Sequence, residues 1–329
     1  MALSFAFLLL LAILGGCNNN FAPKEKIRLN EATHSIFYAP QYVAIENGYF
    51  KNEGIDLDIV TDSGSGTTMV ALISGNADIG LMGTETSIHF YNEGIEDYIV
   101  NFAGLTQRAG NFLVARENID SFTWEHIKGR HVLGGKAGQM PQIIFEYILK
   151  KNGIDPKRHL TIEQSIDFGS TSAAFSEGQG DFTIEFEPSA TILEIEKKAY
   201  IVASLGVDSG YLPYTSYCVK KSYMEKNPDT IQRFTNALQQ GMDYVNTHNA
   251  KEIAKVIAPH FSEIDIEAIE IIIERYQEQN TWKDNLILEE NSFDLLQNIL
   301  EEYGTLSERV LYDNLVNTTY AKESISKPK

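Results

Sequence analysis

The feature that most constrains the fold of this chain is one pattern that recurs about a hundred residues further on. Residues 46–57 (ENGYFKNEGIDL) combine a helix end, a glycine stop and a strand, and residues 145–155 (FEYILKKNGID) repeat this order. A second pair follows in the same way, at residues 71–80 (ALISGNADIG) and 174–183 (AFSEGQGDFT). Glycine commonly ends a helix because it adopts the left-handed conformation without strain. The pattern predicts an α/β protein with two lobes of similar build, each with a mainly parallel sheet.

Two apolar runs suit strands that pass between these lobes, namely residues 112–116 and 214–219. They predict one lobe at residues 27–113 plus 217–320 and a second lobe at residues 114–216, with hinges near Ala115 and Ser216. A helix should open at Pro228. Further helices are expected at residues 251–257, 265–277 and 292–302, and residues 321–329 should fray.

The N-terminus carries an apolar run at residues 6–14 (AFLLLLAIL), which Gly15, Gly16 and Cys17 follow. The run is much shorter than the ~20 apolar residues of a membrane-spanning helix and is typical of a signal peptide. Residues 14–17 (LGGC) resemble the lipobox of exported lipoproteins, whose cysteine is acylated and becomes the new N-terminus. We therefore expect a signal peptide at 1–16, lipid (palmitate) on Cys17, a tether at 17–26 and an extracytoplasmic location. A buried apolar helix is the alternative, and the lack of a basic residue before the run leaves the true start open.

Charge and cysteine content exclude several classes of function. The formal net charge of −18 argues against a nucleic-acid partner, because phosphate backbones need clustered Lys and Arg. An acidic, well-solvated surface explains the same charge more simply. With Cys17 assigned to lipid, Cys218 has no partner for a structural disulfide or a cysteine-based metal site. We expect neither a metal nor a cofactor. We also expect no catalytic residues, since no Ser-His-Asp arrangement with a nucleophile turn is recognisable.

Three stretches resemble a known family, and the similarity extends from residue 28 to about residue 320. They are residues 37–50 (FYAPQYVAIENGYF), 63–65 (SGS) and 74–80 (SGNADIG). They resemble the solute-binding proteins of ABC importers for nitrate, sulfonate, taurine and thiamine-precursor pyrimidines. The resemblance implies a type II periplasmic-binding-protein fold, in which two lobes close on a small molecule. It also implies a membrane permease with a separate ATPase as partner, and we expect the protein itself to be a monomer.

Candidate binding residues follow from the position of polar loops. In α/β sheets the crevice lies beyond the carboxyl ends of the parallel strands. In the first lobe the candidates are His34, Phe37, Tyr38, Ser63, Gly64, Ser65, Gly83 and Thr84. In the second lobe and its return segment they are Lys136, Gly138, Gln139, Asp167, Glu185, Glu187 and Tyr214.

Each candidate group has a plainer structural reading. His34 fits a hydrogen-bonded loop histidine equally well, and Phe37 and Tyr38 fit the core. The loop at residues 63–66 is also a plausible helix cap. Glu187 is equally suited to a charge at a helix start.

Carboxylates outnumber cations near the predicted crevice, with Glu85, Asp167, Glu185 and Glu187 against Lys136 and Arg108. This balance favours an amine-bearing or heteroaromatic solute, and an aminopyrimidine of the thiamine-precursor type is the leading hypothesis. A sulfonate, taurine or nitrate remains an alternative. A sensor for a membrane receptor remains another, because it needs the same binding change. The third is an enzyme like the fungal pyrimidine synthases, whose cysteine-rich iron motif this sequence lacks.

Overall fold

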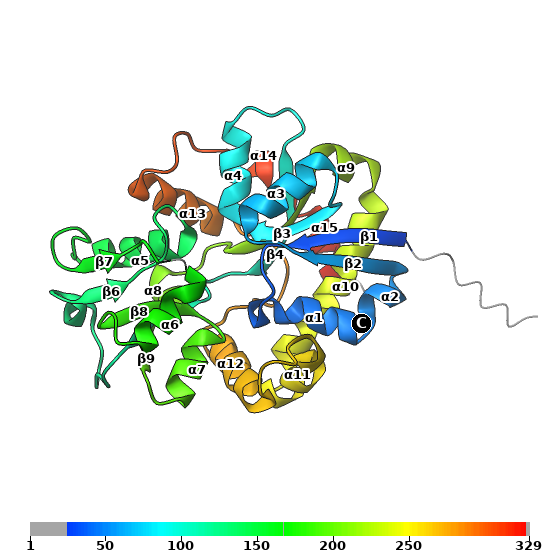
Figure 1. Cartoon of the computed structure of the whole chain (residues 1–329). Coiled ribbons are helices and arrows are strands. Elements are labelled where there is room, and N and C mark those ends of the chain that lie inside the picture. Colours follow the sequence, from blue (N-terminus) through cyan, green and yellow to red (C-terminus); the bar gives the residue numbers. More distant parts are fainter. Residues whose placement is uncertain (1–24, 167, 327–329) are drawn as a thin grey trace, which may run out of the picture.

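The structure is a computed structural model that describes residues 25–166 and 168–326 (Figure 1). It contains two five-stranded sheets, each flanked by helices, which form two lobes side by side. The predicted signal peptide and the predicted lipidation site Cys17 lie outside the described residues, so both stay predictions.

The sheet of lobe one has the strand order β2-β1-β3-β10-β4. Strand β1 pairs in parallel with β2 and β3, whereas β10 runs antiparallel to both β3 and β4. The bounds of these strands are β1 (Glu25–Glu31), β2 (Ile55–Thr61), β3 (Ile79–Gly83), β4 (Ile99–Thr106) and β10 (Thr215–Lys220).

The sheet of lobe two repeats this arrangement, with the order β7-β6-β8-β5-β9. Strand β6 pairs in parallel with β7 and β8, and β5 runs antiparallel to both β8 and β9. The strands are β5 (Asn111–Ala115), β6 (His131–Leu133), β7 (Thr161–Glu163), β8 (Phe182–Phe186) and β9 (Tyr200–Ser204). Each sheet therefore has one antiparallel strand among parallel ones, and the predicted α/β class with two similar lobes is confirmed.

The chain passes between the lobes a few residues earlier than the sequence suggested. Strand β5 bonds only to strands of lobe two and β10 only to strands of lobe one, so neither crosses. The passages are residues 107–110 and 210–214, and a hydrogen bond from Leu212 to Gln107 joins them. A second bond, from Tyr214 to Thr106, ties the later passage to the end of β4. Ala115 and Ser216, the predicted hinges, are buried in paired strands. Their apolar runs were mistaken for crossovers because central strands carry the same apolar pattern.

Helices cover the sheets of both lobes (Figure 1). Those packed with lobe one are η1 (Ile36–Tyr38), α1 (Ala39–Glu46), α2 (Tyr49–Asn52), α3 (Ser65–Ser74), α4 (Thr84–Asn92), α9 (Lys221–Lys226), α10 (Pro228–Thr247), α11 (Ala250–Ile257), η4 (Ala258–His260), α12 (Ile266–Glu278), α14 (Tyr312–Leu315) and α15 (Thr319–Ser326). Those of lobe two are η2 (Trp124–Ile127), α5 (Met140–Lys151), η3 (Phe168–Ser170), α6 (Thr171–Ser176), α7 (Ser189–Ile195) and α8 (Leu205–Ser209). Helix α13 (Glu290–Tyr303) comes late in the chain and packs on α5 of lobe two.

Helix α10 lies at the centre of the core of lobe one, and the last described helix, α15, packs against it. Its apolar stripe, from Ile231 to Met242, is buried against α1 and α15. Residues 321–326, expected to fray, belong to α15, whose Ala321 is fully buried and which packs on α10. The sequence obscured this helix because it has few apolar residues: besides the small Ala321, only Tyr320 packs against the core, where its ring meets Phe102 edge to face. The other three helices predicted after residue 250 match α11, α12 and α13.

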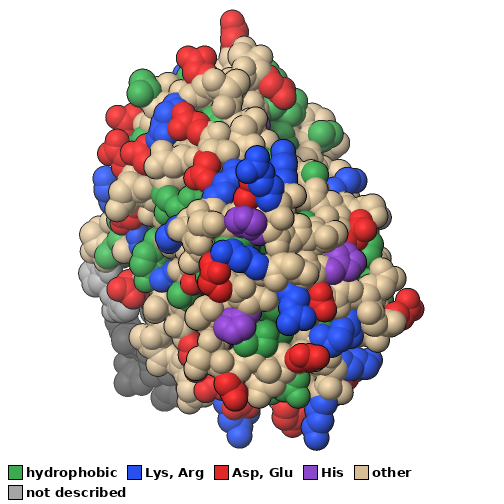
Figure 2. Space-filling model, turned by 90° about the vertical axis from the view of Figure 1, so that its left-hand side faces the viewer, with side chains coloured by type: hydrophobic (Ala, Val, Ile, Leu, Met, Phe, Trp, Pro, Cys, Tyr) green, Lys and Arg blue, Asp and Glu red, His purple; other side chains and the backbone are tan. Residues whose placement is uncertain are grey.

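The face of the molecule that Figure 2 presents carries several basic side chains together in its upper middle. Elsewhere on this face acidic and basic side chains are interspersed, with hydrophobic groups in small separate areas. The acidic excess of the sequence is thus not gathered on this face. Among the described helices, none has both the length and the apolar character needed to cross a membrane.

Candidate functional site

A cavity of about 730 Å³ lies between the two lobes. Its walls are the loops that follow β1, β2 and β3 in lobe one, the start of α5 and the end of β8 in lobe two, and the start of β10. This is the position that α/β sheets favour for ligands, beyond the carboxyl ends of parallel strands. Of the predicted site residues, the cavity is lined by His34, Phe37, Tyr38, Ser63, Gly64, Ser65, Gly83, Gly138, Gln139, Glu185, Glu187 and Tyr214.

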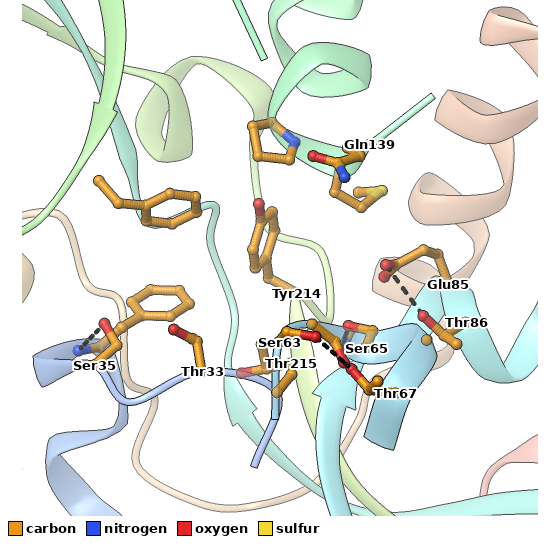
Figure 3. Close-up of a pocket in the computed structure, with 18 of the residues that line it drawn as sticks. Thr33, Ser35, Ser63, Ser65, Thr67, Glu85, Thr86, Gln139, Tyr214 and Thr215 are labelled. Atoms are coloured by element: carbon orange, nitrogen blue, oxygen red, sulfur yellow. Dashed lines mark hydrogen bonds between the residues drawn. The ribbon is translucent and has the colours of Figure 1, made fainter. Parts of the chain in front are cut away.

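The floor on the side of lobe one is rich in hydroxyl groups (Figure 3). Gly64 precedes α3 with a φ of 130°, a conformation that L side chains rarely adopt, so glycine is required there. The Ser65 hydroxyl accepts a hydrogen bond from the Gly83 amide at 3.0 Å, which ties this loop to the end of β3. Thr67 donates to the Gly64 carbonyl at 2.8 Å. The loop is therefore built as the start of a helix, and its hydroxyls also line the cavity.

Aromatic rings from both lobes form the opposite end of the cavity. The ring centroid of Phe37 lies 5.8 Å from that of Tyr214 and 6.2 Å from that of Phe186, both in edge-to-face geometry. Phe37, Tyr38 and Tyr214 are buried, so they belong to the core and line the cavity at once. In Figure 3 the hydroxyl of Tyr214 points toward the side of the cavity that carries Gln139. Phe186 was not among the predicted residues, although it lies between two that were.

Two glutamates, one from each lobe, line the cavity without a basic partner. Burial raises the pKa of Glu85 and the pKa of Glu185 from 4.5 to about 7 in each case. Glu85 Oε2 is buried and makes no hydrogen bond with the described residues, while Oε1 lies 3.4 Å from the Thr86 hydroxyl. Glu185 Oε1 accepts from Thr183 at 2.7 Å. Figure 3 shows Glu85 below Gln139 and next to Thr86, with its carboxylate turned toward the side of the cavity that carries Tyr214.

Glu187 also lines the cavity, but its carboxylate is already bound within the protein. It accepts from the guanidinium of Arg275 at 2.6 Å and from the backbone and side chain of Thr191 at 2.9 and 3.0 Å. Burial raises the pKa of Glu187, and Arg275 and the Thr191 bonds oppose that shift. Since Thr191 lies in the first turn of α7, the alternative reading of Glu187 as a charge at a helix start fits this geometry.

His34 lines the cavity with both ring nitrogens occupied. Nδ1 lies 3.1 Å from Glu31 and 2.9 Å from the Tyr42 hydroxyl, and Nε2 lies 2.8 Å from the carbonyl of His260. The hydrogen bond to Glu31 raises the pKa of His34. The ring also stacks on Phe261 with centroids 4.7 Å apart. The reading of His34 as a hydrogen-bonded loop histidine therefore fits its surroundings.

Two of the predicted residues do not join the cavity wall. Thr84 is buried and turns toward β10, where its hydroxyl lies 2.9 Å from that of Ser216. Lys136 is exposed and is not part of the lining. Asp167 lies outside the described residues. The sequence could not separate these cases because loop position alone does not say where a side chain points.

No lysine or arginine lines the cavity among the described residues. Arg108, the other expected cation, instead donates to the Gly206 carbonyl at 2.8 Å and lies over the ring of Tyr211. Apart from its two tyrosines, the ionisable side chains of the described lining are His34, His89, Glu85, Glu185 and Glu187. Burial lowers the pKa of His89, so this ring is a weak source of positive charge. Within residues 25–166 and 168–326 no group of three or more metal-ligating side chains is found.

The arrangement of two lobes, hinge segments and an interlobe cavity defines the periplasmic-binding-protein fold. The alkanesulfonate-binding protein SsuA of Xanthomonas axonopodis pv. citri has this fold with a TM-score of 0.69 at 16% identity, over 89% of this chain and 98% of that one. The nitrate-binding protein NrtA of Synechocystis PCC 6803 also has a TM-score of 0.69, at 13% identity, over 91% of this chain and 88% of its own.

Sequence comparison gives the family. The model of the NMT1/THI5 like family matches residues 36–252, so the chain belongs to this family, as its resemblance suggested. "Putative binding protein YtlA" of Bacillus subtilis (strain 168) is 42% identical over 301 residues, which are 92% of this chain and 90% of YtlA. A more distant relative is the 4-amino-5-hydroxymethyl-2-methylpyrimidine phosphate synthase THI5 of Saccharomyces cerevisiae, 20% identical over 64% of this chain and 63% of its own length.

Proposed function

We propose that this protein is an extracytoplasmic solute-binding lipoprotein of an ABC importer, and that its solute is a small nitrogen heteroaromatic bearing an amine. The leading solute is a thiamine-precursor aminopyrimidine. The protein captures it between the two lobes and delivers it to a membrane permease that a separate ATPase drives.

The observation that carries the proposal is the charge of the cavity. Nitrate and sulfonates are anions, and a site for them would gain from Lys or Arg, whereas the described lining has neither. It has instead Glu85 and Glu185, which face the cavity from different lobes without a basic partner. A carboxylate accepts hydrogen bonds from an amine, and a protonated carboxyl donates one to a ring nitrogen. Both forms are accessible near neutral pH because the pKa of each group is raised to about 7.

The aromatic end of the cavity supports a ring-shaped solute. The rings at this end come from both lobes and belong to Phe37, Phe186 and Tyr214. They can contact an aromatic solute, because aromatic groups prefer offset or edge-to-face contact with one another. Gln139 and the hydroxyls of the floor add donors and acceptors for substituents. The curated relatives in yeast are named for a reaction product of the same chemical class, which is consistent with the proposal.

Closure of the lobes is the proposed mechanism of capture. A solute that contacts both lobes has differential affinity for the closed state, so it shifts the equilibrium toward closure. The two passages at 107–110 and 210–214 are bonded side by side and would act as the hinge. The 42% identical relative carries a binding name, which favours binding without turnover over the enzyme alternative.

One observation favours a second candidate, a solute with an anionic group, such as a sulfonate, the zwitterion taurine or nitrate. Helices α3 and α5 both begin at the cavity, and the N-terminus of a helix carries partial positive charge. Two such helix ends partly offset the missing basic side chains. The two candidates differ in what Glu85 does, since an unpaired carboxylate repels an anion and attracts an amine.

A thermal-shift panel tests the solute class. The melting temperature of the full-length chain in detergent should rise with 4-amino-5-hydroxymethyl-2-methylpyrimidine, because a ligand that binds only the folded state stabilises it. Taurine and MOPS should leave it unchanged. Stabilisation by taurine or MOPS without a response to the pyrimidine would overturn the proposed solute in favour of the anion.

The lipid anchor is a separate part of the proposal and rests on Cys17 alone. Expression in a lipoprotein-processing bacterium with labelled palmitate should label the wild-type chain and leave Cys17→Ser unlabelled. The variant Cys218→Ser is the matched control, since Cys218 is fully buried. Equal labelling of the wild type and Cys17→Ser would contradict the anchor.

A ligand sensor is distinguished by its partner, so copurification with a receptor kinase and not with a permease would favour that alternative.

A further inference from the structure

Two helices that follow the sheet of lobe one reach across to lobe two. Helix α12 packs against α7 and helix α13 packs against α5. Figure 1 shows α12 in orange on one side of the molecule and α13 in brown on the other, with the space between the lobes lying between them. The lobes are therefore joined by more than their two passages.

The first contact, which we call the α12 clasp, consists of Arg275 with Glu187, Thr191 and Glu194. The Arg275 guanidinium donates to Glu187 at 2.6 Å, to Thr191 at 2.5 Å and to Glu194 at 2.8 Å. The side chain of Glu187 is fully buried and that of Arg275 is 18% exposed. Glu187 therefore depends on Arg275, because a buried charge that loses its partner strongly destabilises the fold.

The second contact, the α13 clasp, consists of Tyr303 and Glu302 with Gly138 and Lys150. The Gly138 amide donates to the Tyr303 hydroxyl at 3.1 Å. The Lys150 ammonium donates to the backbone carbonyl of Glu302 at the same distance, 3.1 Å. This clasp is more exposed than the first, so we expect it to contribute less.

Both clasps end on residues that line the cavity, Glu187 in one case and Gly138 in the other. Helix α12 packs on η1 and α11 of lobe one. Helix α13 packs on lobe two, but the residues before and after it bond to lobe one, Leu286 to Gly104 of β4 and Glu308 to Asn92 of α4. Each of two wall segments of lobe two is thus held from lobe one. If the lobes separate, Glu187 loses its cation and Gly138 loses its acceptor. These contacts consequently favour the arrangement in which the cavity is enclosed.

We propose that α12 and α13 hold lobe two against lobe one around the cavity, with Arg275 as the positioning residue of the stronger clasp. Arg275 acts through Glu187 and does not itself line the cavity. Because the clasps favour the enclosed arrangement before a solute arrives, they raise the fraction of protein that is competent to retain it. The inference rests on the proposed function only in assuming that a solute binds between the lobes.

The distance between the lobes in the absence of solute is the direct readout. Cysteines introduced at Lys51 in lobe one and Lys157 in lobe two, both exposed, carry nitroxide labels in the full-length chain. Cys17→Ser is present in every sample, and Cys218 is buried and unreactive to label. Pulsed electron spin resonance then gives the distance distribution, which does not depend on which solute is correct.

Arg275→Gln should shift this distribution to longer distances, Arg275→Lys should shift it less, and Tyr303→Phe least. Arg275→Gln should also weaken binding of 4-amino-5-hydroxymethyl-2-methylpyrimidine by about fivefold or more, in proportion to the lost enclosed fraction. Arg309→Gln is the matched control, because Arg309 also bonds two carboxylates, Asp294 and Glu301, but within the segment of α13. It should leave the distances unchanged.

An unchanged distance distribution in folded Arg275→Gln would overturn the proposal. If that variant does not fold, Glu194→Gln and Tyr303→Phe decide, and unchanged distances in both would overturn it. Failure of the pyrimidine to bind the wild type would instead contradict the proposed solute and leave the distance measurement intact.

Discussion

Lobe one and lobe two share one strand order but bring different chemistry to the cavity between them. Lobe one contributes a hydroxyl-rich floor and Glu85, whereas lobe two contributes Gln139, Phe186 and Glu185. Lobe one also carries the long helix α10 with α11 and α15, and lobe two has no counterpart to them among the described residues. The repeated sheet therefore fixes where the cavity lies, while the loops decide the chemistry of its walls and the helices α12 and α13 are proposed to hold the lobes together.

The largest expected effect concerns the packing that only lobe one has. A Cβ at Gly241 of α10 would clash with the carbonyl oxygen of Pro40 in α1, which is rigid backbone. We expect Gly241→Ala to lower the free energy of unfolding by about 1–3 kcal/mol, measured by urea denaturation. Gly66→Ala is the control, since a Cβ there meets open space and should change stability by about 0.5 kcal/mol or less. Equal stability of the two variants would show that α10 and α1 are not in close contact.

The two cavity glutamates, Glu85 of lobe one and Glu185 of lobe two, should each make the stability of the protein depend on pH. Because burial raises the pKa of each from 4.5 to about 7, the folded state holds the proton more tightly than the unfolded state. Their contribution to stability is therefore full below pH 4.5 and is lost as the pH rises to about 7, by up to about 3 kcal/mol per group.

Glu185→Gln and Glu85→Gln should each flatten this loss, which urea denaturation at pH 5 and pH 8 measures. Glu185 is the more buried of the two side chains, so its variant should flatten the dependence more. The exposed Glu117→Gln is the control and should follow the wild type. If the free energy of unfolding of both cavity variants fell between pH 5 and pH 8 as much as that of the wild type, these carboxyls would not be buried in solution.

Solute affinity should depend on both lobes. We expect Glu85→Gln to weaken binding of 4-amino-5-hydroxymethyl-2-methylpyrimidine by roughly tenfold, because a charge-assisted hydrogen bond becomes a neutral one. Phe186→Leu should weaken it by about three- to tenfold through the lost aromatic contact. Calorimetry of the full-length chain measures both. If both variants bound the pyrimidine as tightly as the wild type does, the solute would not bind in this cavity.

The smallest expected effect is that of Lys136, the cation that the sequence placed in the site. Since its side chain is exposed and outside the lining, Lys136→Ala should change the affinity for the same pyrimidine by less than about twofold. A tenfold loss of affinity would return a cation to the site and favour the anionic solute.

Local patterns were sufficient to predict most of the fold. Gly75 is an example, because it ends α3 in the left-handed conformation as the repeated pattern required. The strand ends also predicted which loops meet at the cavity. What the sequence did not contain was the direction and partnership of single side chains. Glu187 is paired with Arg275, 88 residues further along the chain, and only tertiary packing creates that pair.

The unknown direction of single side chains also explains why the sequence included Thr84 among the site residues and left out Phe186. Thr84 follows β3 as expected, but its hydroxyl turns to Ser216 on the neighbouring strand β10. Phe186 ends β8 between two glutamates, and strict alternation along the strand would have turned it away from them. Because β8 ends there, all three residues line the cavity.

Calorimetric titration of the full-length wild-type chain with two probes tests the central claim most directly. The cavity without lysine or arginine should give saturable heat with 4-amino-5-hydroxymethyl-2-methylpyrimidine and none with MOPS, a sulfonate of comparable size. Saturable binding of MOPS together with no binding of the pyrimidine would contradict the account.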